Sequence, residues 1–155
     1  VTLPVKDRER VLRPLEVSQR VKPELLFDES LKVLLVEDNH TNAFILQAFC
    51  KKYKMQVDWA KDGLEAMEFL ADNTYDLILM DNQLPHLGGI ETTHEIRRNL
   101  RLGTPIYACT ADTAKETSDA FMAAGANYVL LKPIKENALH EAFVDFKQRF
   151  LLERT

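Results

Sequence analysis

The stretch Lys32–His40, which reads KVLLVEDNH, joins an apolar run to two adjacent carboxylates. Its first five residues suit a buried strand, and Glu37 and Asp38 then stand side by side at the end of that strand. Neighbouring carboxylates repel each other, and they do not both ionise easily unless another group compensates their charge. The stretch therefore predicts a strand whose end holds a cationic partner.

The rest of the chain repeats the step from strand to helix. Apolar runs predict strands at 31–36, 55–60, 75–81, 104–109 and 127–131, and helical spacing predicts helices at 41–53, 63–72, 88–99, 114–125 and 136–152. Because the strand runs are continuously apolar, we expect helices to cover both faces of the sheet. The pattern predicts an α/β fold with a doubly wound, five-stranded parallel sheet of the flavodoxin-like type, in strand order 2-1-3-4-5.

Residues 1–30 do not follow this pattern. Pro4, Pro14 and Pro23 interrupt both helix and sheet, and charges of both signs are mixed without a sustained period. We interpret 1–30 as a linker, in which 1–5 could end a strand of a preceding domain, and 31–152 as the structured domain.

Composition narrows the functional classes. The formal net charge of -4 provides no basic face for nucleic acid. No apolar run approaches the roughly 20 residues that cross a bilayer, so we expect no direct membrane contact by this segment. Cys50 and Cys109 lie in apolar segments without metal-ligand spacing, which predicts buried free thiols in a reducing compartment.

Acidic side chains follow two strands that this strand order makes neighbours. In an open parallel sheet the binding crevice lies beyond the carboxyl ends of the strands, here between the first and third. The third strand ends in Asp81, so Glu37, Asp38 and Asp81 should converge there and hold a hard cation such as Mg²⁺. An alternative is that Glu37 and Asp38, with Asn39, cap the following helix. That alternative does not explain Asp81.

Two further polar groups end the fourth and fifth strands. Thr110 supplies a hydroxyl and Lys132 an ammonium group. Each alone could be an ordinary turn residue or a solvated charge. Together with the carboxylates they describe a site for an anionic tetrahedral group, in which Asp81 could accept a phosphoryl group as an acyl phosphate.

The segments VLLVEDN, DLILMDNQLPHLGGIE, TPIYACTAD and GANYVLLKPI, in this order, resemble the receiver domain of two-component response regulators. The resemblance implies that Asp81 is the phosphoacceptor and that Thr110 and Lys132 contact the phosphoryl group. It implies that Asp38, Asp81 and the backbone carbonyl of Gln83 bind Mg²⁺, with Glu37 acting through water.

The resemblance also concerns residues beside the site. It implies that Gln83 and Asp112 tune the lifetime of the phosphoryl group and that the Lys132–Pro133 peptide bond is cis. One position departs from the family, which usually has Tyr or Phe three residues before the lysine. Val129 stands there, and Tyr128 should point to the opposite face of the strand.

The stretches MDNQLPHLGGIETTHEIRR and NYVLLKPIKE are similar to the autoinducer-sensing hybrid histidine kinases of quorum-sensing bacteria. This implies a C-terminal receiver domain in the cytoplasm, in a parent chain anchored in the bacterial inner membrane, with 1–5 ending the kinase ATPase domain. The implied partners are the kinase domain of the same chain and a histidine phosphotransfer protein. Phosphoryl transfer from phosphohistidine to Asp81, and onward to or back from that protein, would depend on Mg²⁺.

Two alternatives stay open. One is a pseudo-receiver that docks proteins without being phosphorylated, against which the intact set of site residues argues. The other is a phosphatase with an aspartyl nucleophile, which would need a second aspartate two residues after the first, whereas the sequence reads EDN.

The first long helix also predicts a docking face. Ile45, Leu46, Phe49 and Tyr53 recur at helical spacing and should be mostly core, whereas Phe44 lies opposite them and should be exposed. We expect a helical phosphotransfer protein to dock on the start of this helix and on the loop after the fifth strand. The predicted contacts are Asn42, Phe44, Ile45 and Ile134.

Overall fold

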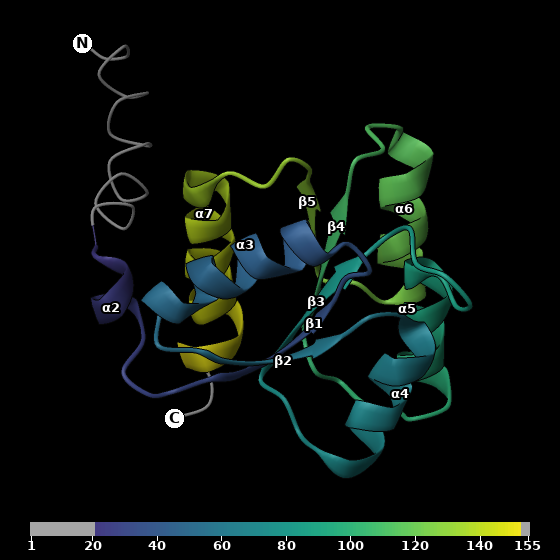
Figure 1. Ribbon diagram of the computed structural model, residues 1–155, viewed down its shortest axis with the longest axis horizontal. Coiled ribbons are helices and arrows are strands. Elements are labelled where there is room, and N and C mark those ends of the chain that lie inside the picture. The colour runs from purple at the N-terminus through teal and green to yellow at the C-terminus, as the bar shows by residue number, and fades with distance from the viewer. Residues whose placement is uncertain (1–20, 153–155) are drawn as a thin grey trace, which may run out of the picture.

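The computed structural model describes residues 21–152, in which five parallel strands form one sheet in the order β2-β1-β3-β4-β5 (Figure 1). The strands are β1 (Lys32–Val36), β2 (Gln56–Ala60), β3 (Leu77–Asp81), β4 (Ile106–Thr110) and β5 (Tyr128–Leu131). The helices are α2 (Pro23–Leu26), α3 (His40–Lys52), α4 (Gly63–Asp72), α5 (Gly89–Arg98), α6 (Lys115–Ala124) and α7 (Glu136–Phe146). The predicted fold class and strand order are confirmed.

Helices cover both faces of the sheet, with α3 and α7 on one side and α4, α5 and α6 on the other (Figure 1). Successive side chains of a strand point to opposite faces, so each strand supplies both cores. Val33 and Leu35 of β1 pack toward α3 and α7, while Leu34 and Val36 pack toward the other three helices. All four are buried, which explains why the strand is apolar without interruption.

The ends of the helices lie close to the predicted positions. Asn39 caps α3 by accepting a hydrogen bond from the Asn42 N–H at 2.8 Å. Gly125 ends α6 with φ of +118°, in the left-handed region that favours glycine. The predicted closing helix is divided, because α7 ends at Phe146 and a π-helical segment, Lys147–Leu151, continues it.

The segment before β1 packs against the domain. The ring of Phe27 is buried and lies 6.0–6.2 Å from the rings of Tyr53, Phe143 and Phe146. The Lys147 ammonium donates a hydrogen bond to the Leu26 carbonyl at 2.7 Å. Most of the predicted linker, including the strand end at 1–5, lies outside the described residues. The boundary at residue 31 stays a prediction.

Two further expectations concern the described part of the chain. Cys50 and Cys109 are free and buried, as predicted. Among residues 21–152, no helix has the length and apolar character needed to cross a membrane.

Candidate active site

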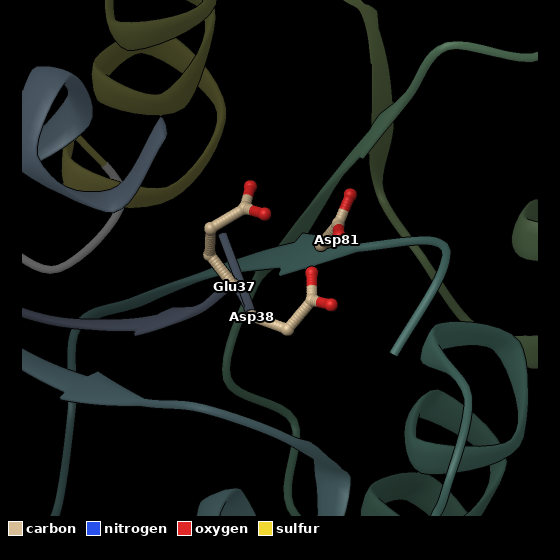
Figure 2. Close-up of side chains that lie close together, drawn as sticks. All are labelled: Glu37, Asp38 and Asp81. Carbon is tan, nitrogen blue, oxygen red and sulfur yellow. The ribbon is translucent and has the colours of Figure 1, made fainter. Parts of the chain in front are cut away.

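Three carboxylates meet at the carboxyl edge of the sheet. Glu37 and Asp38 follow β1, Asp81 ends β3, and an oxygen from each lies within 4.8 Å of the others (Figure 2). Glu37 and Asp81 are buried, whereas Asp38 is exposed. The strand order therefore brings together the acidic residues that the sequence places at separate strand ends.

Lys132 pairs with two of these carboxylates. Its ammonium nitrogen lies 2.6 Å from Oδ1 of Asp81 and 3.1 Å from Oε1 of Glu37. The lysine follows β5, and its backbone N–H donates to the Thr110 carbonyl at 2.8 Å, which extends the pairing of β4 with β5 by one residue. The side chain thus bridges the ends of β1 and β3 from the far side of β4.

The electrostatics of the site reflect this crowding. Burial raises the pKa of Asp81 to about 6; the hydrogen bond from Lys132 opposes the rise, and repulsion from Glu37 adds to it. Burial would lower the pKa of Lys132, but pairing with Asp81 and Glu37 raises it above its ordinary value. The lysine is therefore charged at neutral pH, and Asp81 is largely ionised.

Thr110 is buried next to the acidic group. Its hydroxyl oxygen accepts hydrogen bonds from the Asn82 side-chain amide at 3.2 Å and from the Asp112 N–H at 3.0 Å. Thr110 and Asp81 end adjacent strands, since β3 pairs with β4 up to Asp81 and Cys109. The hydroxyl hydrogen remains available for a bond toward the cleft.

The loop after β1 is held by contacts that the sequence analysis missed. The Trp59 indole N–H donates to the Glu37 carbonyl at 2.7 Å, and the Asn39 N–H donates to Oε2 of Glu37 at 3.2 Å. Asn39 is thus the cap of α3, whereas the carboxylates of Glu37 and Asp38 line the cleft. Asn82, directly after Asp81, could have been singled out by its position, but no sequence signal links Trp59 to the loop.

Gln83 and Asp112 are both exposed and line the same cleft as the carboxylates. The Asp112 carboxylate accepts from the Ala114 N–H at 2.8 Å and from the Thr117 hydroxyl at 2.6 Å. These bonds, with Thr117 contributing most, lower the pKa of Asp112. Its side chain thus stabilises the turn into α6, and its predicted influence on phosphoryl lifetime stays a prediction. The Lys132–Pro133 bond is cis, as the resemblance implies.

The predicted docking residues divide into two places. Asn42, Ile45 and Ile134 line a hollow beside the cleft, together with Lys132 and Pro133. We call this hollow the α3–β5 groove.

Phe44 is exposed, as predicted, with 75% of its surface accessible. It lines a different hollow, with Trp59 and His40. In the predicted core stripe, Leu46 and Tyr53 are buried, while Ile45 is 42% exposed and belongs to the rim.

Val129 and Tyr128 occupy opposite faces of β5. Val129 packs toward α4, α5 and α6, whereas Tyr128 packs toward α3 and α7, stacked on Tyr107 at 5.0 Å. Tyr128 therefore does not replace the missing aromatic residue at position 129, as the one-residue offset predicts.

A family model described as the response regulator receiver domain matches residues 33–144. The chain belongs to this family.

Two curated relatives are similar to the chain over most or all of its length. The chain is 94% identical over all 155 residues to the autoinducer 2 sensor kinase/phosphatase LuxQ of Vibrio harveyi, where it covers 18% of that protein. It is 54% identical over 147 residues to LuxQ of Vibrio cholerae, covering 95% of this chain and 17% of that protein. The chain thus spans less than a fifth of the length of these relatives.

One solved receiver domain has a similar fold and contains a metal ion. The receiver domain of the sensor histidine kinase PA1611 from Pseudomonas aeruginosa, which has a magnesium ion coordinated in its active-site cleft, is 34% identical. It covers 77% of this chain and 97% of its own, with a TM-score of 0.68.

Proposed function

We propose that this chain is the phosphoacceptor domain of a phosphorelay within a hybrid sensor kinase, and that Asp81 accepts the phosphoryl group. The observation that carries this proposal is the position of Asp81, buried beside two carboxylates and 2.6 Å from Lys132. A carboxylate oxygen attacks phosphorus, and the P–N bond to a donor histidine breaks. The bonding electron pair stays with the imidazole nitrogen, which takes up a proton.

Lys132 and Thr110 stabilise the transferred group. When Asp81 becomes an acyl phosphate, its carboxylate loses its charge, while the phosphoryl oxygens bring their own negative charge into the cleft. Lys132 can pair with these oxygens while it stays paired with Glu37. The Thr110 hydroxyl donates to another phosphoryl oxygen. Both groups are fixed at strand ends, so they need little reorganisation at the moment of transfer.

The residues present fit Mg²⁺. Three carboxylates converge, and Asp38 is open to solvent, so a divalent cation could enter and relieve the repulsion. We propose that Asp38, Asp81 and the Gln83 carbonyl hold the ion, with Glu37 acting through water. When bound, the ion supplies positive charge for the phosphoryl oxygens.

The first test is phosphorylation by acetyl phosphate with Mg²⁺, followed by intact mass measurement. We expect one phosphoryl group on the wild type and none on Asp81→Asn, because an amide oxygen is a poor nucleophile. Asp72→Asn, the same change at an exposed site on α4, should label normally. Labelling of Asp81→Asn at the wild-type level contradicts the assignment. An unlabelled wild type supports the pseudo-receiver, and turnover of unrelated phosphate esters supports the phosphatase.

The second test concerns the metal ligands. Asp38→Ala should weaken Mg²⁺ binding by at least about tenfold, in the range for lost metal-site groups. Thermal stability in metal-free buffer should change little or rise, because a repelling carboxylate is removed. Titration calorimetry gives the affinity, and Trp59 fluorescence should report it because the indole bonds to the Glu37 carbonyl. An unchanged affinity would refute the role of Asp38.

We further propose a helical histidine phosphotransfer protein as the partner, docked on the α3–β5 groove. The groove is apolar and opens beside Lys132, so a helix lying in it can bring a histidine to the cleft. Ile45 and Ile134 supply apolar contacts, and Asn42 lines both the groove and the cleft. Phe44 stays in the predicted set, on the adjoining flank of α3.

Ile134→Ala and Ile45→Ala should lose transfer to the partner by about tenfold or more while acetyl phosphate labelling stays intact. Phe44→Ala tests whether the docking surface extends around α3 as far as Phe44. Loss of transfer in this variant would mean that Phe44 lies inside the interface. Normal transfer in all three variants would contradict the docking face.

The cellular context is proposed from the same relatives. We propose a parent hybrid kinase, anchored in the bacterial inner membrane and active in quorum sensing, whose kinase domain phosphorylates this domain in the cytoplasm. Residues 31–152 would form the receiver, preceded by a linker whose Leu26 and Phe27 pack against it.

A further inference from the structure

The loop between β3 and α5 is tied to the start of α4. Nδ1 of His86 lies 2.9 Å from Oδ2 of Asp62, two residues that are 24 positions apart in the sequence. The carboxylate can accept this hydrogen bond from the charged ring or from the neutral tautomer protonated at Nδ1. Asp62 also caps α4 by accepting from the Glu65 N–H at 2.8 Å, and both bonds lower its pKa.

The backbone at His86 is strained. Its φ is +68°, a conformation that residues other than glycine adopt rarely and at a cost in free energy. The Leu87 N–H donates to the Pro85 carbonyl at 2.7 Å and closes a three-residue turn around His86. Such a turn persists only where surrounding contacts hold it, and the Asp62 contact is one of them.

A second contact lies beside the first. Gly63, the first residue of α4, approaches Leu87 so closely that an added Cβ atom would lie 2.6 Å from the Leu87 carbonyl oxygen. The first residue of the loop is also held, because the Asn82 carbonyl accepts a hydrogen bond from the Gly89 N–H at 3.0 Å. The loop is therefore held at both ends, and Gln83 lies between these attachments.

We propose that the His86–Asp62 pair is a clamp that positions the β3–α5 loop, and with it the Gln83 carbonyl, for Mg²⁺ binding at Asp81. This inference rests on the proposed function, because it assigns His86 and Asp62 as positioning residues for that site. Neither side chain lines the cleft that holds Asp81. Their effect passes through the backbone between His86 and Gln83.

The test is a double-mutant cycle of His86→Gly and Asp62→Ser. Glycine tolerates positive φ and carries no side-chain donor, and serine retains the helix cap, so each change removes the contact between the two side chains. Amide hydrogen exchange of residues 82–88 is measured without metal, and Mg²⁺ affinity is measured by calorimetry. Arg101→Gly is the control, because Arg101 is exposed, has a positive φ of +55° and lies outside the loop.

We expect each single variant to exchange about three- to fivefold faster in the loop and to bind Mg²⁺ about two- to fivefold more weakly, in the range for a partly exposed pair. The double variant should be no worse than either single one. Additive effects, or unchanged loop exchange, would overturn the clamp. Hydrogen exchange is measured without metal or phosphate, so its result does not depend on phosphorylation. A wild type that takes no phosphoryl group from acetyl phosphate would refute the proposed function and leave the exchange result unaffected.

Discussion

Asp81 is the proposed reactive residue, and its ionised carboxylate lowers the stability of the folded domain. Its carboxyl ionises with a pKa of about 6 in the folded protein, against roughly 3.9 for an aspartate in an unfolded chain. The folded state therefore holds the proton more tightly than the unfolded state does. The stability that this contributes is fully present below about pH 4 and is lost as pH rises through about 6. At neutral pH, an ionised Asp81 destabilises the metal-free domain relative to acid conditions.

Asp81→Asn should remove this dependence. In buffer with a chelator, the stability of the variant minus that of the wild type should increase by roughly 2–3 kcal/mol between pH 4 and pH 7, since one pKa unit corresponds to about 1.4 kcal/mol. Urea denaturation across this pH range measures the difference, to which groups that do not interact with Asp81 contribute equally in both proteins. A difference that is flat or that falls with pH would show that Asp81 is not the group responsible.

At the scale of elements, Arg97 joins α5 to its neighbours. Its guanidinium donates to the carbonyls of Gly125 and Leu102 at 3.0 and 2.7 Å and to the Asn127 side chain at 3.0 Å. The same Asn127 oxygen accepts from the Ile106 N–H at 2.9 Å. One side chain thus connects the end of α5 with the loop after α6 and the start of β4.

Gly125→Ala should disturb this junction. The residue has φ of +118°, and a Cβ atom there would lie 2.6 Å from Cγ of Arg97. We expect a loss of about 1–3 kcal/mol in urea denaturation, with acetyl phosphate labelling retained in the folded protein.

Gly103→Ala is the matched control, because a Cβ atom there meets nothing within 4 Å. It should change stability by less than about 1 kcal/mol. Equal losses in both variants would contradict this account of Gly125.

At the scale of the whole molecule, the segment before β1 belongs to the core that α3 and α7 cover. Leu26 and Phe27 are buried with the residues of that core, although they lie in the range interpreted from sequence as linker. In the sequence, Leu25, Leu26 and Phe27 form a short apolar cluster among prolines and charged residues. The burial of Leu26 and Phe27 depends on α7, which lies more than a hundred residues later.

A chain that begins at Leu31 should therefore be less stable than one that begins at Val21, by about 3 kcal/mol or more, comparable to losing a buried phenylalanine. Phe27→Ala in the complete chain isolates the contribution of the ring. Thermal and urea denaturation measure the stability of the three proteins. Equal stability of the chain that begins at Leu31 would support the boundary at residue 31.

The sequence alone predicts the order of strands and helices, the parallel sheet and the convergence of Glu37, Asp38 and Asp81. These follow from local rules, since apolar periodicity identifies the elements and a parallel sheet aligns the carboxyl ends of its strands at one edge. Thr110 and Lys132 could be predicted for the same reason, because each directly follows or ends a strand.

The contacts between side chains that are distant in the sequence become visible in the folded structure. The pairing of Lys132 with Glu37 spans 95 positions, and that of His86 with Asp62 spans 24. The Trp59 bond to Glu37, the burial of Phe27 and the separation of Phe44 from the α3–β5 groove likewise depend on how helices and loops pack. Packing joins segments that are distant in the chain, and periodicity along the sequence carries no information about such contacts.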